Sequence, residues 1–588
     1  MARENIAVHV THEAAEKTGG IGAVLQGFFT CPSYLQAVQR SILVSPLFTT
    51  DGSVENRLGQ DGQVLYSSID GLVDPSYRGI FERIERLYNV GIVYGRRTFA
   101  DDETGAQSCP EVLLIDVRYM DTGMLNGFKR RLFEEFGIQS HSHEHLWEYE
   151  QYIRVATPAI EALKALGVTE GDTSIIAHEF MGMPTTLAAI LEPQCHFRTI
   201  FYAHEVATIR RIVEEHPGHD TMFYNAMQRA QAEGLYLNDV FGCQDSYFKH
   251  ALVEASKYCD HLYAVGDYVA EELRFLAPEF AATDIGVVYN GIGAYEISAD
   301  DKRASKDKLQ RYCQTLLGYR PDYVFTHVTR LVRSKGLWRD LQVLSELDKA
   351  FGETGQTAFF VLLSTEVSRR CDGDVRRMEA AYGWPVAHRE GWPDLSGGEA
   401  HFHTAIQRFN ARSRNVKAVF INQFGFDRRS CGSRMPNDME FVDIRKGSDV
   451  EFGQSVYEPF GIAQLEPLTF GGICVFTDIC GCAGFVRDVT EGQEVRNIIL
   501  ADYTELGTPP PADIEDILQI DQPVRDRIEG NEGIRVANEI MQRLPRNDAD
   551  LEALIREGYH LARKMSWDVV VRKYVLSGLT ATGETVPC

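Results

Sequence analysis

Short, unbroken runs of apolar residues recur along this chain, and each is followed by a stretch with the apolar spacing of a helix. The first run is Ile6–Val10, and the later ones are Ser41–Phe48, Val112–Val117, Ser174–Ala177, Thr199–Ala203, Val287–Tyr289, Val324–Val328, Ala358–Leu363, Val416–Asn422, Ile473–Thr477 and Asn497–Ala501. Continuous rather than alternating apolarity is typical of strands buried on both faces, as in parallel sheets covered by helices. Strand–helix alternation over 588 residues therefore predicts an α/β fold with two doubly wound, Rossmann-like units.

The boundary between the units is predicted to follow Asn290-Gly291-Ile292-Gly293. A charged stretch comes next, and a new apolar strand opens at Tyr323. The predicted ranges are 1–295 for the first unit, 296–320 for a linker, 321–565 for the second unit and 566–588 for a final helix that crosses back to the first unit. Insertions are expected at about 50–150, in the two parts 50–110 and 119–150, and at about 365–455.

The chain is acidic, with a formal net charge of −25 and a pI near 5.2. Such a surface repels the phosphates of nucleic acids and anionic lipids, so we expect neither as a partner. No apolar stretch reaches the ~18 residues that suggest a membrane-spanning helix, and the 12 cysteines are sparse. We expect a cytoplasmic protein with reduced thiols and no integral membrane segment, and the sequence is compatible with a homo-oligomer.

A glycine-rich loop, Lys17-Thr18-Gly19-Gly20-Ile21-Gly22, follows the first predicted strand and opens a helix. Glycines let the backbone approach a ligand closely, and free N–H groups at a helix N-terminus attract phosphate. Lys17 adds a mobile positive charge. The pattern also suits a plain turn between strand and helix, and it matches neither a Walker A loop nor the dinucleotide-binding G-x-G-x-x-G.

A second motif, Thr329-Arg330-Leu331-Val332-Arg333-Ser334-Lys335-Gly336, follows the predicted strand Val324–Val328. Ligands of open α/β sheets bind outside the carboxyl ends of the strands. Arg330 offers a planar fork for phosphate oxygens and Lys335 a point charge, so the pair could neutralise a departing diphosphate. Three cations in a loop can also be an ordinary solvated surface.

The third motif is Ser455-Val456-Tyr457-Glu458-Pro459-Phe460-Gly461-Ile462-Ala463-Gln464-Leu465-Glu466. Glu458 precedes a predicted helix that begins at Gly461, and Glu466 would lie roughly 12 Å further along it. That separation suits a nucleotide sugar, with one carboxylate at the sugar hydroxyls and the other at the ribose. Two carboxylates on an ordinary helix face are the other interpretation, although Pro467 within that helix predicts a kink.

In this order, the three motifs resemble those of the glycogen and starch synthases and of the wider retaining GT-B glycosyltransferases, the group 1 glycosyltransferase superfamily. The supporting segments that are similar to the family are Ile176–Phe180, Thr199–His204, Val288–Ile292 and Ser566–Asp568. The resemblance spans residues 17 to about 577. It implies a GT-B fold, in which two Rossmann-like domains face each other across a cleft, the first on the acceptor side and the second binding the nucleotide sugar.

The resemblance implies four catalytic positions. His204 would line the sugar subsite and steady positive charge there. Arg330 and Lys335 would stabilise the leaving nucleoside diphosphate, and Glu458 would bind the transferred sugar. The donor sugar bond would break through an oxocarbenium-like state, with the acceptor hydroxyl entering from the same face.

The resemblance further implies binding positions at Lys17, Gly19, Gly20, Asn290, Gly461 and Glu466. The first three would hold the donor phosphates, and the backbone near Gly461 would contact the diphosphate or sugar. Glu466 would bind the ribose, and Asn290 would lie near the acceptor. No cofactor and no essential metal are expected, because cationic side chains and helix dipoles take the place of a metal ion in this family.

The function that the resemblance implies first is transfer of a glucosyl unit from ADP-glucose or UDP-glucose to an α-glucan such as glycogen. The alternative is a retaining GT-B enzyme with a small sugar, a sugar phosphate or a lipid head as acceptor. Phe460 and Glu466 depart from the bacterial glycogen synthases and look more like the archaeal-type synthases or the broader sugar transferases. The loop Asp478–Phe485 also differs from the synthase pattern and favours the broader family. A non-catalytic GT-B scaffold and a phosphorylase are further hypotheses, but no pyridoxal-bearing lysine site is identifiable.

Two clusters look like metal sites at first sight. His141, His143 and His145 alternate as on one face of a strand, but no fourth ligand is evident, so a solvated insertion loop is the preferred interpretation. Cys480 and Cys482 lack a second cysteine pair for zinc and are expected to pack in a tight turn. His401 and His403 are expected on a helix face.

Overall fold

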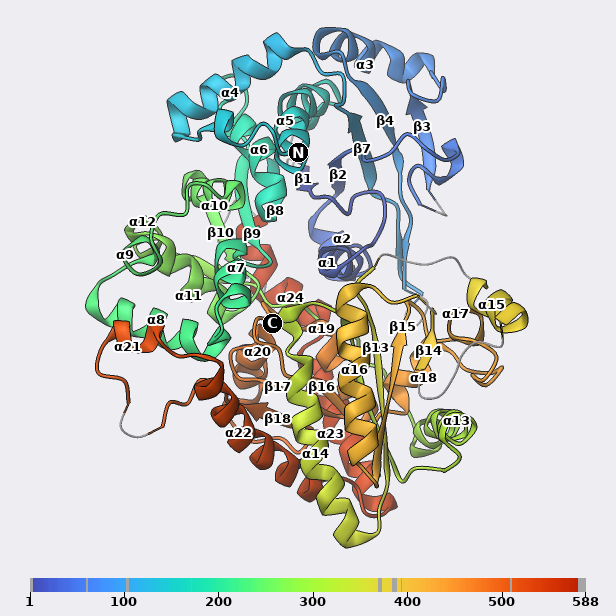
Figure 1. Cartoon of the computed structure of the whole chain (residues 1–588). Coiled ribbons are helices and arrows are strands. Elements are labelled where there is room, and N and C mark those ends of the chain that lie inside the picture. The colour runs from blue at the N-terminus through green and yellow to red at the C-terminus, as the bar shows by residue number, and fades with distance from the viewer. Residues whose placement is uncertain are drawn as a thin grey trace. The chain divides into compact units, whose positions relative to one another are not determined.

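The computed structural model of the protein describes residues 4–59, 62–101, 105–170, 172–367, 373–382, 389–392, 394–507 and 510–579. The chain forms two compact units, and each combines segments that are distant in sequence (Figure 1). Unit 1 consists of Met1–Ile209, Glu233–Gly291 and Trp567–Cys588, and unit 2 of Arg210–Ala232 and Ile292–Ser566. The segment 210–232 thus lies inside the range predicted for the first unit but packs in unit 2, whereas residues 567–579 pack in unit 1.

Unit 1 contains a nine-stranded sheet in the order β11-β10-β9-β8-β1-β2-β7-β4-β3. Its strands are β1 (Asn5–Val10), β2 (Arg40–Pro46), β3 (Gln63–Ser67), β4 (Gly91–Arg96), β7 (Glu111–Asp116), β8 (Asp172–His178), β9 (Arg198–Ala203), β10 (His261–Ala264) and β11 (Ile285–Val287). The pairings are parallel except those of β4 with β3 and β7, so part of the expected 50–150 insertion extends the sheet as an antiparallel edge. The short strands β5 (Phe99–Ala100) and β6 (Gln107–Ser108) form a separate pair.

The helices of unit 1 follow the strands in chain order. They are α1 (Gly20–Phe29), α2 (Pro32–Ala37), α3 (Pro75–Tyr88), α4 (Thr122–Phe136), α5 (Trp147–Ala165), α6 (Glu179–Ile190), α9 (Leu237–Phe241), α10 (Phe248–Glu254), α11 (Asp267–Leu276), α12 (Pro278–Ala281), α24 (Trp567–Val570) and α25 (Leu576–Leu579). Helix α7 (Ala207–Glu215) spans the boundary between the units, and α8 (His219–Glu233) lies almost wholly in unit 2.

Unit 2 contains a seven-stranded sheet in the order β14-β15-β13-β12-β16-β17-β18, with parallel pairings throughout its described residues. Its strands are β12 (Tyr323–Arg330), β13 (Ala358–Thr365), β14 (Arg389–Gly391), β15 (Val416–Asn422), β16 (Val450–Gly453), β17 (Ile473–Thr477) and β18 (Ile498–Ala501). Three of them, β14, β15 and β16, lie in the range 365–455. That range was expected to be an insertion, and this expectation is wrong, because it supplies one edge strand and two interior strands of the sheet.

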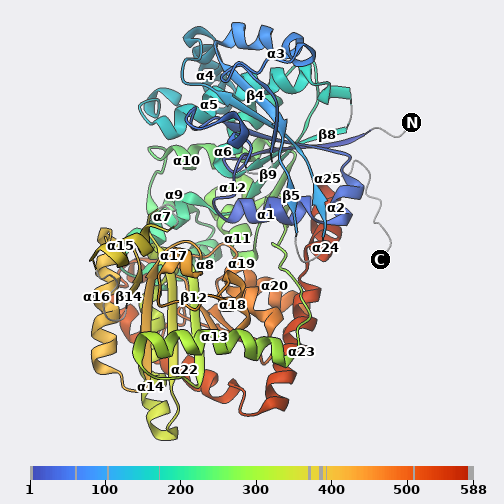
Figure 2. The ribbon, with the colours of Figure 1, turned by 90° about the vertical axis from the view of Figure 1, so that its right-hand side faces the viewer.

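The helices of unit 2 cover both faces of its sheet. They are α13 (Ala299–Leu317), α14 (Leu337–Thr354), α15 (Asp374–Tyr382), α16 (Gly397–Arg412), α17 (Arg428–Cys431), α18 (Phe441–Lys446), α19 (Ile462–Leu465), α20 (Gly481–Thr490), α21 (Ile514–Leu518), α22 (Gln522–Arg543) and α23 (Asp548–Lys564). Successive residues of β12 point to opposite faces. Phe325 packs in the core with α14, α16 and α22, and Val324 packs in the core with α13 and α18 (α13 crosses in front of the sheet in Figure 2).

The α/β class and the two doubly wound units, which are the components of the predicted GT-B fold, are confirmed. The cleft between them stays a prediction. Searched over its described residues, the chain has no helix with the length and apolarity needed to cross a membrane.

A fully buried ion network holds the segment 210–232 in unit 2. The guanidinium of Arg339 donates to both carboxylate oxygens of Asp220 at 2.9 and 2.7 Å and to Glu529 at 2.8 Å. All three side chains have 0 % exposure, and the ring of Tyr503 lies 3.8 Å from the guanidinium carbon. The segment is therefore anchored by charges that have no access to water.

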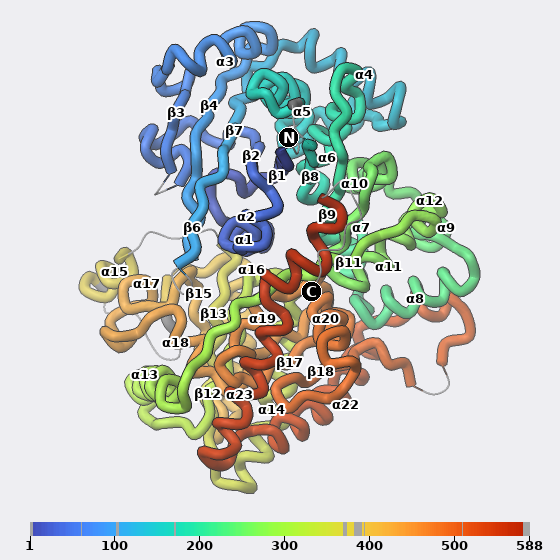
Figure 3. Tube along the Cα trace, turned by 180° about the vertical axis from the view of Figure 1, so that it is seen from behind, coloured from blue at the N-terminus to red at the C-terminus, as the bar shows by residue number. Residues whose placement is uncertain are grey.

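The C-terminal segment belongs to unit 1 through aromatic and polar contacts (red in Figure 3). The indole of Trp567 packs edge-on against Phe28, and a Cβ on Gly27 would lie only 2.1 Å from that indole. Arg198 donates to the carbonyl of Leu579 at 2.9 Å. Position 27 therefore has to be glycine for the C-terminal segment to reach α1.

Candidate functional site

The two loops that carry the second and third motifs meet at the carboxyl edge of the unit 2 sheet. Strand β12 has β13 on one side and β16 on the other, so the chain order reverses there, and ligands of doubly wound sheets bind at such a point. The N–H groups of Val456 and Tyr457 donate to the carbonyl of Ser334 at 2.8 and 3.2 Å. Gly336 has φ +59°, and a Cβ there would lie 2.3 Å from the carbonyl oxygen of Gln454.

This loop contact brings Lys335 to Glu458. The ammonium of Lys335 forms an ion pair with the Glu458 carboxylate, and the two side chains keep 15 % and 13 % exposure. Arg330, the last residue of β12, is exposed, and its guanidinium forms no ion pair or hydrogen bond with the described residues. The third cation of the loop, Arg333, donates to the carbonyl of Glu214 at 2.9 Å. The edge therefore holds the free guanidinium of Arg330 and the paired Lys335 beside a carboxylate, which is a suitable set for a phosphorylated ligand.

Gly461 is the N-cap of the short helix α19 and has φ +90°. A Cβ at this position would lie 2.1 Å from Oε1 of Gln464, so only glycine fits without rearrangement. The α-helix ends at Leu465 and continues as a 3₁₀ helix over Glu466–Phe470, with Pro467 in its first turn. The kink predicted at Pro467 thus falls where the α-helix gives way to a 3₁₀ helix.

Glu466 is oriented by Arg445, a residue that the sequence analysis did not single out. Arg445 bridges Glu466 at 2.6 Å and the buried Glu451 at 2.8 Å. Glu451 also accepts from the N–H of Val328 at 3.0 Å. Because the Glu466 side chain is 42 % exposed, it still offers lone pairs to a ligand hydroxyl while Arg445 fixes its direction.

The loop after β17 is tied to the third motif by its own N–H groups. Gly481 donates to the carbonyl of Glu458 at 3.2 Å and Cys482 to that of Phe460 at 2.9 Å. A Cβ on Gly481 would lie 1.9 Å from the carbonyl oxygen of Pro459. The thiols of Cys480 and Cys482 are buried and 3.3 Å apart. The loop thus packs against the residues beside Gly461. Both cysteines are buried; Cys480 lies in the turn before α20, as expected, whereas Cys482 lies in the first turn of that helix.

Asp478, which precedes that loop, has an unusual carboxyl group. Burial, and then the nearby charge of Asp502, raise its pKa to about 7, although Arg487 works in the opposite direction. Its Oδ1 has no hydrogen-bond partner within the part of the chain that the structure describes. A carboxyl group at the edge of the site therefore titrates near neutral pH.

In unit 1, the glycine-rich loop is partly filled by an acid of the chain itself. The buried carboxylate of Glu13 accepts from the N–H groups of Thr18 and Gly19, both at 2.6 Å. A Cβ on Gly22 would lie 2.4 Å from the same carboxylate. Lys17 is exposed. A phosphate role for Lys17, Gly19 and Gly20 stays a prediction, and among the loop N–H groups it is confined to those from Gly20 onward.

His204 follows β9 at the carboxyl edge of the unit 1 sheet and is connected to three buried residues. Its Nε2 lies 2.8 Å from Nδ1 of His178, whose Nε2 lies 2.9 Å from Nδ1 of His9. Nε2 of His9 in turn lies 2.7 Å from the hydroxyl of Tyr34. Burial lowers the pKa of His9 and of His204 to about 3 and that of His178 well below its usual value. All three imidazoles are therefore neutral at neutral pH.

Glu179, next to His178, holds a strained backbone conformation with φ +66°. Its carboxylate is buried and accepts from the N–H of Glu205 at 2.5 Å and from that of His204. Burial and the charge of Glu205 raise its pKa well above the usual value. Strain of this kind is typical of functional positions. The hydrogen bonds to the Glu179 carboxylate fix the backbone that carries His204.

Asn290 is 5 % exposed at the end of unit 1's second chain segment. Its Oδ1 has no partner among the described residues. Its predicted place near the acceptor stays a prediction.

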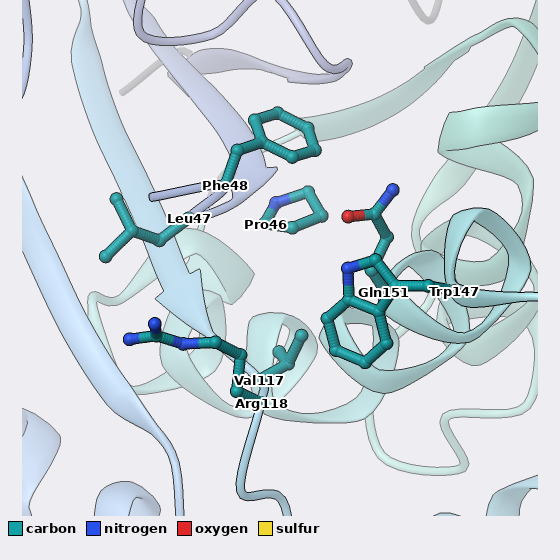
Figure 4. A pocket seen from close by; sticks show the side chains of 7 residues that line it. All are labelled: Pro46, Leu47, Phe48, Val117, Arg118, Trp147 and Gln151. Atoms are coloured by element: carbon teal, nitrogen blue, oxygen red, sulfur yellow. The ribbon is translucent and has the colours of Figure 1, made fainter. Parts of the chain in front are cut away.

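A pocket of about 270 Å³ lies at the carboxyl ends of β2 and β7 in unit 1 (Figure 4). Phe48 and Trp147 line it with half-exposed rings, and the amide of Gln151 points toward it. Arg118 is held by two 2.8 Å bonds to Asp116. Half-exposed aromatic rings with nearby polar groups make this pocket a candidate binding surface. No sequence motif marks this pocket, since its residues come from three separate segments.

The histidine cluster at 141–145 is not a metal-like group. His143 is buried beside Tyr149, and the interpretation of a fully solvated loop is wrong for this residue, whereas His141 and His145 are exposed. Searched for metal-binding geometry, the described residues contain one group, Asp245, His250 and Glu254, whose ligand atoms lie within 4.8 Å of one another. The expectation that His401 and His403 lie on a helix is confirmed by α16.

No family model matches the chain, and no curated protein matches it. Solved structures do match over nearly the whole length of both chains. A trehalose-6-phosphate synthase is 13 % identical, with a TM-score of 0.48 and coverage of 98 % of this chain and 99 % of that one. Sucrose-phosphate synthase from Thermosynechococcus elongatus is 12 % identical (TM-score 0.45, 96 % and 96 %). The catalytic domain of starch synthase IV from Arabidopsis thaliana, bound to ADP and acarbose, is 14 % identical (TM-score 0.45, 96 % and 99 %).

Proposed function

We propose that this chain is a retaining glycosyltransferase that transfers a hexosyl unit from a nucleotide sugar. The observation that carries the proposal is the group formed by Arg330, Lys335 and Glu458 at the point of unit 2 where the strand order reverses. Two cations and a carboxylate at that point suit a ligand with a diphosphate on one side and sugar hydroxyls on the other. The residues also match the motifs of the family that the chain resembles.

In the proposed reaction, the free guanidinium of Arg330 binds the donor diphosphate first. Lys335 then shares its ammonium between the diphosphate and Glu458, which leaves a carboxylate oxygen of Glu458 for the sugar hydroxyls. Glu466, held by Arg445, binds the ribose, and the backbone at Gly461 contacts the diphosphate. The placed cations stabilise the charge that grows on the leaving group, so the reaction needs no essential metal.

The bond between C1 of the sugar and the diphosphate oxygen breaks through an oxocarbenium-like state. Its electron pair leaves with the diphosphate. The acceptor hydroxyl then attacks C1 from the same face, and a diphosphate oxygen takes its proton. His204 and Asn290 of unit 1 are assigned to the sugar and the acceptor, and Lys17, Gly19 and Gly20 to the donor phosphates, by the resemblance.

For the acceptor, we place a small sugar or sugar phosphate before the α-glucan. The pocket lined by Phe48 and Trp147 measures about 270 Å³, near the lower end of the range for small-molecule sites. Glu466 and the loop Asp478–Phe485 also favour the broader transferase family over the glycogen synthases. In this assignment the two rings pack on the apolar face of the acceptor sugar, and the amide of Gln151 binds a hydroxyl.

The donor part of the proposal is tested with a panel of ADP-, UDP- and GDP-sugars, first by calorimetry and then by transfer to hexoses, hexose phosphates and glycogen. In the Lys335→Ala variant the transfer rate should fall by about 10²–10³, as when one pre-organised charge contact is removed. The matched control is Lys349→Ala, on an exposed turn of α14 in the same unit. A Lys335→Ala variant with an intact fold and a near-wild-type rate would overturn the proposal. The anomeric configuration of the product, read by NMR, tests retention.

The acceptor part is tested separately with Trp147→Ala. We expect its KM for the small acceptor to rise at least tenfold while donor binding stays unchanged. Tyr119→Ala is the control, because Tyr119 is 75 % exposed and does not line the pocket. If the wild-type protein extends glycogen and Trp147→Ala leaves every acceptor KM unchanged, the glucan assignment replaces the small acceptor.

A further inference from the structure

We propose that Tyr34, acting through His9 and His178, fixes His204 as a neutral imidazole that carries its proton on Nδ1. Tyr34, His9 and His178 are in this sense positioning residues for His204. The use of that proton by a substrate rests on the proposed function. The proton arrangement itself rests only on the geometry of unit 1.

The chain of contacts is continuous and has a single path. It runs from the hydroxyl of Tyr34 to Nε2 of His9 (2.7 Å), from Nδ1 of His9 to Nε2 of His178 (2.9 Å), and from Nδ1 of His178 to Nε2 of His204 (2.8 Å). The rings of His178 and His204 are nearly parallel, with 5.1 Å between their centres. Tyr34 and His9 have 0 % exposure, as does His178. Water therefore does not interrupt the chain.

Each contact between two ring nitrogens needs one proton, since a neutral imidazole has one N–H donor and one nitrogen acceptor. Three neutral rings in series can meet this condition in only two ways. In the first, all three carry the proton on Nδ1, and the Tyr34 hydroxyl donates to His9. In the second, all three carry it on Nε2, and His9 donates to the Tyr34 oxygen. The tautomers of the three rings are therefore set together.

Tyr34 decides between the two arrangements. In the first arrangement its hydroxyl proton lies in the 2.7 Å contact with His9. In the second arrangement that proton has to turn to Ser41, whose hydroxyl oxygen is 3.5 Å away. A buried donor left with so long a contact is strongly disfavoured. The first arrangement therefore prevails, and it leaves His204 with Nδ1–H as a donor on its far side.

His204 is partly exposed, and its Nδ1 forms no hydrogen bond within the described part of the chain. A neutral Nδ1–H donates to an oxygen and cannot accept from one. The ligand group that it recognises is therefore an oxygen with a free lone pair, such as the hydroxyl oxygen of the transferred sugar. The neutral ring offers this donor without adding a second positive charge next to an oxocarbenium-like centre.

The test is a long-range ¹H–¹⁵N correlation spectrum of the full chain labelled at histidine, recorded at neutral pH without a donor. We expect the coupling pattern of an Nδ1–H tautomer for His9, His178 and His204. An Nε2–H pattern, or a protonated ring, at His204 overturns the proposal. Since this measurement uses the wild-type protein, it does not depend on whether any variant folds.

The role of Tyr34 is tested with Tyr34→Phe. Without the hydroxyl, both arrangements leave one buried group of His9 unpaired, so His204 should populate both tautomers and give averaged shifts. If about half of the molecules then hold the donor form, the apparent dissociation constant of the nucleotide sugar rises about twofold. Tyr149→Phe is the matched control, because Tyr149 is equally buried in unit 1 and bonds Ser140 at 2.7 Å instead.

The outcomes separate this inference from the proposed function. A protein that shows the Nδ1–H pattern but transfers no sugar supports the tautomer assignment and contradicts the transferase. A protein that transfers sugar but shows the Nε2–H pattern supports the transferase and contradicts the tautomer assignment. An unchanged His204 spectrum in a folded Tyr34→Phe variant contradicts the role of Tyr34.

Discussion

The buried ion network in unit 2 allows a sharp test of what holds the segment 210–232 in place. Replacing Arg339 by methionine keeps the volume of the side chain but removes its charge. Asp220 then loses the one cationic partner that it has among the described residues, whereas Glu529 keeps Trp338 at 2.9 Å and Arg525 at 3.4 Å. Removing one partner of a fully buried pair costs about 3–5 kcal/mol. We expect the cost to fall mainly on Asp220, because burial already raises the pKa of that carboxyl.

The assay is amide hydrogen exchange of the peptides that cover α8, because a single melting temperature is poorly defined for a protein with two units. A loss of 3–5 kcal/mol corresponds to exchange that is faster by about 10²–10³ or more. The double variant Asp220→Asn/Arg339→Met should recover most of the protection, since no buried charge is left without a partner. Arg527→Met, on the exposed side of α22, is the control.

Two results would refute the reasoning. One is exchange within about threefold of the wild type in Arg339→Met. The other is a double variant that is no better protected than the single one. The first result would mean that apolar contacts alone anchor α8. The second would mean that the loss of stability does not come from the unpaired carboxylate of Asp220.

Three further predictions follow from single positions. For Asp478, whose pKa is raised to about 7, the folded protein favours the protonated form, so the free energy of unfolding falls as pH rises from 4 through 7. Asp478→Asn should remove this loss, at most about 4 kcal/mol, as measured by amide hydrogen exchange of the peptides around Asp478 at pH 5 and pH 8, corrected for the intrinsic exchange rate at each pH. Gly461→Ala forces a Cβ against Gln464 at φ +90° and should weaken donor binding about tenfold in calorimetry; unchanged affinity would show that the donor does not contact this turn. Gly27→Ala displaces the indole of Trp567, so a protease should release the C-terminal segment faster than in the wild type, at a cost of about 1–3 kcal/mol.

The parallel sheets were predictable because most of their strands are continuous runs of apolar residues. Strands such as β13, with eight buried residues in a row, cannot be solvated on either face. Strand β16 was missed for the opposite reason: it has four residues, and one of them is Glu451. The charge of Glu451 is compensated by Arg445 and the N–H of Val328, which no local pattern reveals.

Part of the candidate site was likewise predictable from sequence motifs, and part was not. The loops that carry Arg330, Lys335 and Glu458 have motifs, and the structure brings Lys335 and Glu458 together as an ion pair. The glycine-rich loop also has a motif, but its N–H groups are shared with Glu13, because a carboxylate five residues away competes for the donors that a phosphate would use.

The hydrogen-bonded chain behind His204 could not be predicted, since its members come from three strands and a helix that are adjacent only in the folded sheet. The four residues, His9, Tyr34, His178 and His204, are separated by irregular distances along the sequence, so no motif connects them.

The return of the C-terminal segment to unit 1 has a consequence for how the protein is made. The sheet of unit 1 is complete at β11, but Trp567, which covers Gly27 and Gly291, is synthesised only after the whole of 292–566. At about 5–20 residues per second, roughly 15–55 s pass before it emerges. During that interval the apolar face around Phe28 is open on the ribosome. The nascent chain thus exposes the apolar surface on which α24 later packs. A product that ends before α24 would keep this surface exposed to chaperones and proteases.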